Sequence, residues 1–211
     1  MKLKALIRTN EIIDFTGDPE IEVSSVEYDS RAVRPGSLFV AIKGLQDDGR
    51  LYIKDAVQAG ASAIMLDSPL NEDPGVPVIM VPDARRSMGL AAAELYAHPA
   101  EQLVMIGITG TKGKTTTAFL LESILKQAGH DTGLMGTIKV SFAGQERPSL
   151  ITTPESADLQ KYLSEMVQSG VTHTVFEVSS HALALSRVAG CKFDIGVFTT
   201  LGQEHLDYHQ D

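Results

Sequence analysis

The stretch GITGTKGKTTTAF, residues 107–119, decides how the second half of the chain folds. Its last glycine, Gly113, is followed by Lys114 and Thr115, as in a phosphate-binding loop. The common form G-x-x-x-x-G-K-[ST] would also need a glycine where this sequence has Ile108. An apolar run precedes the loop and a helical pattern follows it. This order of strand, glycine-rich turn and helix is what phosphate binding requires, because backbone amides and a helix N-terminus then converge on the anion.

The side chains of the loop suit a magnesium nucleotide. Lys114 can reach the β and γ phosphate oxygens, and the hydroxyl of Thr115 can hold Mg²⁺. The net charge of the chain is -9 at pH 7, so its overall field repels an anionic ligand. Positive groups must therefore be concentrated at the site, and Lys112 and Lys114 lie within the loop. The same acidic balance argues against a nucleic-acid partner.

Short apolar runs alternate with helical patterns along the whole chain, which is typical of α/β folds. A helical pattern ends at a proline within residues 98–102, where we place a domain boundary. We predict a small N-terminal α/β domain at 1–98 and part of a P-loop ATPase domain with a mostly parallel sheet at 99–211. The expected strands are 37–42, 62–67, 77–83, 103–110, 133–140, 172–180 and 193–201, and the expected helices are 55–61, 84–98, 115–129 and 158–170.

Ligands of parallel sheets bind at the carboxyl ends of the strands, so polar residues that follow strands are candidates for function. Glu177 lies near the end of one expected strand, where it can bind Mg²⁺ or its water shell. His205 follows another and is expected to face the magnesium or the substrate. His205 and His209 are four residues apart, but no third ligand stands at a recognisable spacing, so a zinc site is not predicted.

The segment Asp29-Ser30-Arg31 stands out in the first half of the chain. It follows a short strand-like run and precedes a tight turn at Pro35-Gly36. A hydroxyl and a guanidinium on an exposed turn can bind a carboxylate, a phosphate or the edge of a uracil base. A solvated turn without a ligand explains these residues equally well, so chemistry alone leaves both readings open.

The composition indicates where the protein works. No apolar run approaches the roughly eighteen residues needed to span a bilayer, and the first residues lack the apolar core of a signal peptide. The single cysteine, Cys191, cannot form an intramolecular disulfide and is expected to be a small buried side chain. These features predict a cytoplasmic protein without a membrane partner.

Several long segments, in the same order, resemble the Mur ligases, which are ATP-dependent amide-forming enzymes of peptidoglycan synthesis. The resemblance is strongest to the MurE branch and covers essentially the whole chain. The family's ATP loop is usually TGTNGKTT, which accounts for the unusual glycine spacing. The similar segments are DSRAVRPGSLFVA (29–41), GLQDDG (44–49), TGTKGKTT (109–116), ITTPES (151–156), EVSSHAL (177–183) with the following Arg187, and FTTLGQEHLDYH (198–209).

Carried over by position, the resemblance implies sites for ATP, Mg²⁺ and a uridine nucleotide sugar. The residues implied for ATP are Gly110, Thr111, Lys112, Gly113, Lys114 and Thr115. Those implied for magnesium are Thr115, Glu177 and His205, and those implied for catalysis are Lys114, Glu177 and His205. The residues implied for the substrate are Ser30, Leu45, Gln46, Thr152, Thr153, Ser179 and Arg187. Three residues depart from the family pattern, with Lys112 and Thr200 in place of Asn and Glu204 in place of Asp.

The reaction implied by the resemblance is an ATP-dependent ligation. ATP would phosphorylate the D-glutamate carboxylate of UDP-MurNAc-L-Ala-D-Glu, and the amine of a diamino acid would then displace phosphate and form the amide. Meso-diaminopimelate is expected as the amino acid in preference to L-lysine. Family members are much longer and have three domains, so 211 residues alone are expected to bind the nucleotide sugar, as a monomer, with little or no ligation.

Three other interpretations remain open at this point. A P-loop kinase or GTPase would explain the loop but not the segments at 29–41, 151–156 and 177–183. MurF or folylpolyglutamate synthase would share the ATP loop but not the first hundred residues. A fragment that only binds the nucleotide sugar is the non-enzymatic alternative, and binding without turnover would distinguish it from a working ligase.

Overall fold

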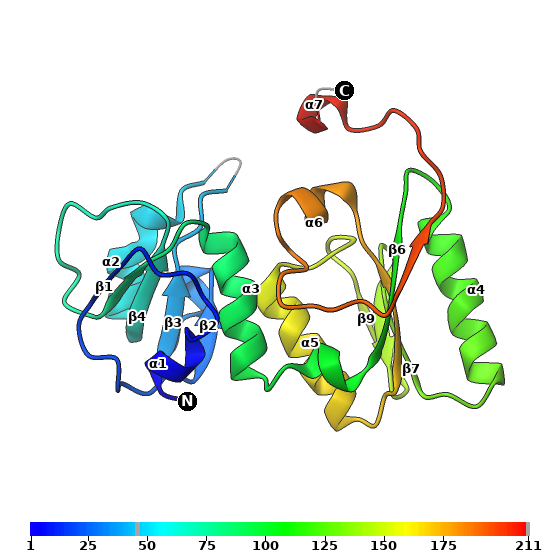
Figure 1. The fold of residues 1–211 in the computed structure, drawn as a ribbon, viewed down its shortest axis with the longest axis horizontal. Helices are drawn as coiled ribbons and strands as arrows, with labels where there is room; N and C mark the ends of the chain where they lie inside the picture. Colours follow the sequence, from blue (N-terminus) through cyan, green and yellow to red (C-terminus); the bar gives the residue numbers. More distant parts are fainter. Residues whose placement is uncertain (45–46, 210–211) are drawn as a thin grey trace. The chain divides into compact units, whose positions relative to one another are not determined.

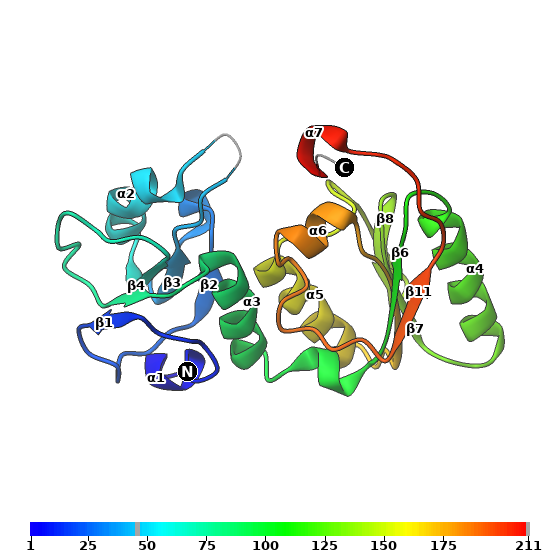
Figure 2. The same cartoon turned by 45° about the horizontal axis from the view of Figure 1, so that its top comes forward.

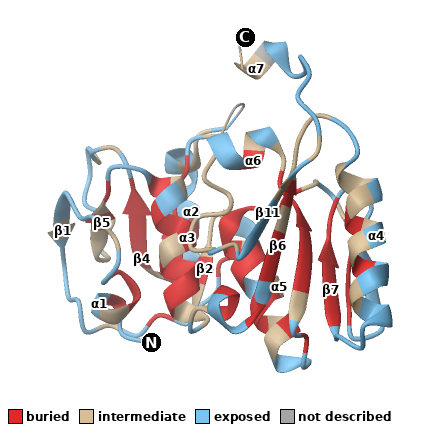
Figure 3. Ribbon diagram, turned by 45° about the vertical axis from the view of Figure 1, so that its right-hand side comes forward, coloured by how far each residue is buried: buried red, intermediate tan, exposed pale blue. Residues whose placement is uncertain are grey.

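The computed structural model describes residues 1–44 and 47–209 (Figure 1). The chain forms two compact units, Met1–His98 and Pro99–Asp211. Each unit contains one sheet, and the buried residues of that sheet belong to the core of the unit (Figure 3). In the described part of the chain, no helix is both long and apolar enough to cross a membrane.

The first unit is a five-stranded sheet in the order β1-β5-β4-β3-β2. Strands β2 to β5 run parallel to one another, and β1 pairs with β5 in the antiparallel sense. Strand β3 is buried along its whole length. The strands are β1 Asp14–Thr16, β2 Ser25–Glu27, β3 Ser37–Val40, β4 Ala61–Leu66 and β5 Val78–Met80, and the helices are α1 Leu3–Leu6, η1 Ser30–Ala32, η2 Gly49–Tyr52, α2 Ile53–Gln58 and α3 Ala84–Leu95.

Glu94, near the end of α3, is a buried carboxylate that lies between Arg8 and His98. Its side chain is 4% exposed, it accepts hydrogen bonds from Arg8 Nε at 2.9 and 3.0 Å, and His98 Nε2 lies 3.3 Å away. Burial raises the pKa of Glu94, but the hydrogen bonds and charges of Arg8 and His98 outweigh burial and leave the pKa below its usual value.

The pKa of Glu94 is lower in the folded state than its ordinary value of 4.5. The ionised carboxylate therefore stabilises the first unit fully at pH values above 4.5. That contribution is lost as the pH falls through the lower pKa of the folded state. At pH 6, Glu94→Gln is expected to be about 1–3 kcal/mol less stable than the wild type, since the charge-assisted bonds are weakened. Urea unfolding should show the difference shrinking at pH 3, and a difference that is equally large at both pH values would contradict this prediction.

The second unit is a six-stranded sheet in the order β11-β6-β10-β7-β8-β9. Strands β11, β6, β10 and β7 are parallel, whereas β7, β8 and β9 form an antiparallel meander. The strands are β6 Val104–Thr109, β7 Thr132–Met135, β8 Lys139–Phe142, β9 Gln145–Pro148, β10 His173–Glu177 and β11 Ile195–Phe198, and the helices are η3 Pro99–Gln102, α4 Lys114–Gln127, α5 Ser156–Gln168, α6 Ser180–Ala184 and α7 Leu206–His209.

Helices α4 and α5 cover opposite faces of this sheet (Figure 2). Successive residues of a strand point to opposite faces, so neighbours in β10 enter different cores. Val175 packs in one cluster with Ala118 of α4, and Phe176 packs in the other with Leu163 of α5. The two cores fix the parallel strands so that the carboxyl ends of β6, β7 and β10 lie along one edge of the sheet.

The predicted α/β class with mostly parallel sheets is confirmed. The expected single strand at 133–140 is wrong, because the chain turns at 136–138 between β7 and the antiparallel β8. A Cβ on Gly136 would overlap Oε1 of Glu177 and lie 2.9 Å from its Cδ, so the backbone passes against that carboxylate as it turns. Strand-forming residues stand on both sides of the turn, so the sequence pattern resembles that of one continuous strand.

Cys191 is half-buried and packs against the core on the α5 side. Gln160 Nε2 lies 3.4 Å from its sulfur. Burial raises the pKa of the Cys191 thiol to about 12, so the thiol stays protonated at neutral pH.

Candidate functional site

The loop between β6 and α4 depends on two glycines with positive φ. Gly110 has φ 129° and Gly113 has φ 86°. A Cβ on Gly110 would overlap Thr199 Oγ1 and lie 2.9 Å from the backbone N and O of Thr200, so space as well as conformation requires glycine there. Gly113 is the N-cap residue of α4, whose first backbone amides have no partner within the helix. These amides and the helix dipole would suit an anion at the mouth of the loop.

The side chain of Lys114 folds back over this loop. Its ammonium donates hydrogen bonds to the carbonyl oxygens of Gly110 at 2.6 Å and Thr111 at 3.3 Å. Both acceptors are neutral, so these bonds position the ammonium without cancelling its charge. The arrangement places one full positive charge beside the free amides of α4, as a bound phosphate would need.

Glu177 ends β10, which pairs with β6 so that Glu177 lies beside Ile108. The residue is 1% exposed. Thr115 Oγ1 donates a hydrogen bond to Glu177 Oε2 at 2.8 Å. Thr137 donates its backbone N–H to Oε1 at 3.0 Å, and its hydroxyl lies 3.2 Å from Oε2. The sheet therefore brings Thr115 and Glu177 into direct contact, although 62 residues separate them in the sequence.

The oxygens of Thr115 and Glu177 fit a magnesium ion. Mg²⁺ binds oxygen at about 2.0–2.1 Å with octahedral geometry, so adjacent ligand oxygens lie about 2.9 Å apart. The observed separation between Thr115 Oγ1 and Glu177 Oε2 is 2.8 Å. Among the described residues, no group of three or more His, Cys, Asp or Glu side chains could hold a metal ion. The pair suits an ion that completes its shell with phosphate oxygens and water, as Mg²⁺ usually does.

His205 is exposed and lies at the mouth of the loop. Its ring packs edge-on against His181, with 4.6 Å between the ring centroids. It lines a cavity of about 380 Å³ whose wall includes Gly110, Thr111, Lys114, Ser179, Ser180 and Glu204. The structure thus places His205 with the phosphate-binding loop, whereas the buried Glu177 and its partner Thr115 lie outside the lining of this cavity.

Four of the residues predicted to hold the substrate, Thr152, Thr153, Ser179 and Arg187, meet around the end of β10. Thr153 is fully buried, and its hydroxyl donates to the carbonyl oxygen of Glu177 at 3.0 Å and accepts from the backbone N–H of Ser179 at 3.1 Å. Ser179 in turn caps α6 by accepting from the N–H of Ala182. Thr152 Oγ1 lies 3.2 Å from Thr137 Oγ1.

Arg187 joins the same group from the loop after α6. Its Nε lies 3.0 Å from Glu155 Oε1, and its Nη1 donates to the carbonyl oxygen of Thr153 at 3.3 Å. Glu155 and Arg187 are mostly buried, with side chains 10% and 18% exposed. This ion pair fixes the guanidinium beside the segment 151–153.

Ser30 lines a separate cavity of about 500 Å³ in the first unit, together with Tyr28, Asp29, Arg31 and Tyr52. Asp29 accepts a hydrogen bond from the N–H of Arg31 at 2.9 Å and pairs with its guanidinium at 2.7 Å. This pairing lowers the pKa of Asp29. Leu45 and Gln46, also predicted to contact the substrate, lie outside the described residues.

Comparison with known proteins identifies the family. A model of the Mur ligase middle domain matches residues 108–211, and a model of the Mur ligase family, catalytic domain, matches residues 22–96. The chain belongs to the Mur ligase family. The family resemblance noted in the sequence is thereby confirmed.

Curated relatives of the chain include two ligases that share one name. The chain is 48% identical over 197 residues to the UDP-N-acetylmuramoyl-L-alanyl-D-glutamate--2,6-diaminopimelate ligase of Caldanaerobacter subterraneus subsp. tengcongensis, covering 93% of this chain and 41% of that protein. It is 43% identical over 212 residues to the ligase of the same name from Oceanobacillus iheyensis, covering 100% and 43%. The chain therefore spans about two-fifths of the length of these relatives.

Solved structures share the fold. A structure of UDP-N-acetylmuramoyl-L-alanyl-D-glutamate--2,6-diaminopimelate ligase superposes with a TM-score of 0.84 at 28% identity, covering 99% of this chain and 42% of that chain. The MurF ligase from Thermotoga maritima, in complex with ADP, superposes with a TM-score of 0.60 at 23% identity, covering 90% and 40%. The second likeness is one of fold alone.

Two residues that depart from the Mur ligase pattern contact each other. Thr200 Oγ1 accepts from the backbone N–H of Lys112 at 3.0 Å and lies 3.2 Å from its carbonyl oxygen. Thr111 N–H donates to the carbonyl oxygen of Thr200 at 2.8 Å, and Gly202 N–H donates to Thr111 Oγ1 at 2.9 Å. Only the backbone of Lys112 takes part, so its exposed side chain stays available to a ligand.

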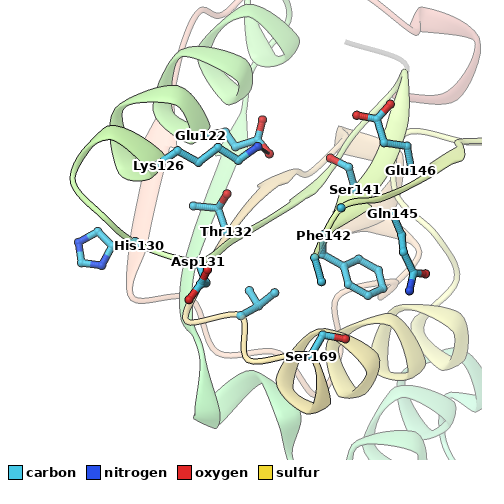
Figure 4. Close-up of a pocket in the computed structure, with 13 residues that line it drawn as sticks. Glu122, Lys126, His130, Asp131, Thr132, Ser141, Phe142, Gln145, Glu146 and Ser169 are labelled. Carbon is cyan, nitrogen blue, oxygen red and sulfur yellow. Dashed lines mark hydrogen bonds and ion pairs between the residues drawn. The ribbon is translucent and has the colours of Figure 1, made fainter.

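A further cavity, of about 330 Å³, lies at the opposite edge of the same sheet, near the start of β7 (Figure 4). Buried Glu122 lines it and pairs with Lys126 at 2.8 Å. The residues predicted for ATP, magnesium and substrate do not line this cavity. It is thus distinct from the candidate site of the Mur ligase chain.

Three residues that contact the predicted site residues were not predicted from the sequence. Thr137 contacts Glu177, Glu155 pairs with Arg187, and Thr199 Oγ1 donates to the carbonyl oxygen of Lys112 at 2.7 Å. Thr137 had a usable signal, since it follows a strand at the carboxyl edge of the sheet. The strand predicted at 133–140 runs through this position and conceals the turn.

Proposed function

We propose that the chain provides the nucleotide-binding and substrate-binding residues of an ATP-dependent ligase that joins a diamino acid to UDP-MurNAc-L-Ala-D-Glu. The observation that carries the proposal is the 2.8 Å contact between Thr115 Oγ1 and Glu177 Oε2 behind the phosphate-binding loop. The names of the relatives support the dipeptide substrate and favour meso-diaminopimelate over L-lysine as the added amino acid.

The loop Gly110–Thr115 would bind the phosphates of ATP through the amides at the start of α4 and the ammonium of Lys114. Thr115 and Glu177 would hold Mg²⁺, with His205 at the open side of the loop as a further metal or substrate contact. A bound magnesium ion supplies positive charge to the β and γ phosphate oxygens. Lys114 supplies the same kind of charge from the protein, which locally offsets the net charge of -9.

In the proposed reaction, a carboxylate oxygen of D-glutamate attacks the γ phosphorus, and ADP leaves. The neutral amine of the diamino acid then attacks the acyl carbon, phosphate leaves, and the amine loses a proton as the amide forms. Thr152, Ser179 and Arg187 would orient the carboxylate toward the loop, and the buried Thr153 would position them, since all four meet at the end of β10.

The first unit, residues 1–98, would bind the uridine nucleotide portion, and residues 99–211 would bind ATP. In the cavity around Ser30, the hydroxyl and the exposed guanidinium of Arg31 are the groups suited to a diphosphate or a uracil edge. The Arg31 side chain is 89% exposed and pairs with Asp29 on its own turn, so it can turn toward a ligand without unfolding a neighbouring element.

Calorimetric titration with UDP-MurNAc-L-Ala-D-Glu tests this proposal, with UDP-GlcNAc as the control ligand. We expect selective binding of the muramyl dipeptide, weakened about tenfold in Ser30→Ala, because one hydrogen bond to the ligand is lost. Ser68→Ala, which lines a different cavity of the same unit, should bind as the wild type does. Failure of the folded wild-type chain to bind would contradict the proposal.

Phosphate release in the presence of Mg-ATP separates a ligase from a binding fragment. Release that depends on meso-diaminopimelate but not on L-lysine would support ligation and identify the added residue. Selective binding without release would favour the alternative that these residues only bind the nucleotide sugar.

A further inference from the structure

We propose that Thr137 is a positioning residue that fixes the Glu177 carboxylate for the magnesium nucleotide and links it to Thr152. The inference rests on the proposed function, because the proposed function assigns Glu177 to the magnesium ion. It starts from two contacts between Thr137 and the two oxygens of that carboxylate. The backbone N–H of Thr137 donates to Oε1 at 3.0 Å, and its hydroxyl lies 3.2 Å from Oε2.

The two contacts determine which way the carboxylate faces. Glu177 is 1% exposed, so its oxygens depend on protein donors in place of water. With Oε1 held by the Thr137 amide, Oε2 is directed at Thr115 Oγ1, 2.8 Å away. That separation is an ordinary hydrogen bond, and it is also compatible with adjacent magnesium ligands, so the two oxygens of the proposed site already lie side by side.

The turn between β7 and β8 delivers Thr137 to this position. Strand β7 is parallel to β10, so its carboxyl end lies beside Glu177. Gly136 N–H donates to the carbonyl oxygen of Lys139 at 3.1 Å, which closes the turn. A Cβ on Gly136 would overlap the carboxylate, so glycine lets the Thr137 amide approach. The turn thus combines a close backbone approach with a hydroxyl aimed at the same group.

The hydroxyl of Thr137 also connects the metal site to the substrate segment. It lies 3.2 Å from Thr152 Oγ1. A threonine hydroxyl has one proton to donate, so Thr137 accepts from Thr152 while it donates to Glu177. Thr152 is half-buried in the segment proposed to hold the substrate. A ligand that bonds to Thr152 therefore acts on the orientation of Glu177 through one intervening hydroxyl.

Titration of ADP at a series of Mg²⁺ concentrations, followed by calorimetry, tests the role of Thr137. Thr137→Val keeps the size and the backbone amide but removes the hydroxyl. We expect the Mg²⁺ concentration for half-maximal tightening of ADP binding to rise about tenfold, with unchanged ADP affinity in the absence of Mg²⁺. Thr137→Ser should restore the wild-type value, and Thr152→Val should give a smaller rise in the same direction.

The outcomes distinguish this inference from the proposed function. The same Mg²⁺ dependence in Thr137→Val and in the wild type, with equal thermal unfolding midpoints, would overturn the positioning role alone. Equal weakening of ADP with and without Mg²⁺ would also overturn it, because the hydroxyl would then support the loop and not the metal ligand. A wild-type chain whose ADP binding is independent of Mg²⁺ would overturn the proposed metal site and this inference with it.

Discussion

Gly110→Ala is expected to weaken Mg-ATP binding at least 100-fold, through the addition of one methyl group. The φ of 129° at this position is strained for any residue with a Cβ. The methyl would also overlap Thr199 Oγ1 and crowd the backbone of Thr200. Because residues 199–202 hold the loop through hydrogen bonds to Thr111 and Lys112, relief of the overlap moves the amides that would bind phosphate.

Gly129→Ala is the matched control for this prediction. Gly129 has φ 87°, but nothing lies within 4 Å of a Cβ built there. Its substitution introduces backbone strain of about 1 kcal/mol without crowding and far from the loop in the sequence. Calorimetry should show that Gly129→Ala binds Mg-ATP as the wild type does. Equal affinities for the two alanine variants would show that the close approach at Gly110 is not needed for binding.

Lys114→Met is expected to lower the affinity for Mg-ATP about 100-fold while the fold is kept. Its ammonium is held over the loop by the carbonyl oxygens of Gly110 and Thr111. From there it can donate charge-assisted hydrogen bonds to phosphate, each contributing about 1.5–3 kcal/mol. The loss of one or two such bonds accounts for the predicted change in affinity.

Lys112→Met removes the same charge from the same loop. This variant therefore distinguishes direct contact of a lysine with the phosphates from the general electrostatic field of the loop. Only the backbone of Lys112 is tied to residues 199–200, and its side chain is exposed. We expect a loss of affinity below about fivefold, as for a screened surface charge. If calorimetry at fixed ionic strength shows that both variants weaken Mg-ATP equally, Lys114 acts through the general field and not through direct contact.

The loop and Glu177 could be recognised in the sequence because both obey a local rule. In a parallel sheet, residues just after strands share one edge, and the loop and Glu177 each stand at such a point. The contact between Thr115 and Glu177 follows from the pairing of β6 with β10. The apolar runs predicted those two strands correctly.

The remaining contacts could not be predicted, because they depend on the register and turns of distant segments. Residues 199–202 reach the loop across some 90 positions of sequence, and nothing in either segment encodes their pairing. The turn at 136–138 passes against the carboxylate of Glu177, and no turn signal besides one glycine marks it in the sequence. The pairing of Glu155 with Arg187 likewise appears only when α5 and the loop after α6 pack together.

Calorimetric titration of the 211-residue chain with ATP, with and without Mg²⁺, tests the magnesium-nucleotide site most directly. We predict one-to-one binding that Mg²⁺ tightens at least tenfold in the wild type. In Glu177→Gln, which keeps the shape of the side chain but weakens its hold on the ion, Mg²⁺ should tighten binding much less. A folded wild-type chain that fails to bind ATP, or tightening by Mg²⁺ that persists unchanged in Glu177→Gln, would contradict the assignment of the site.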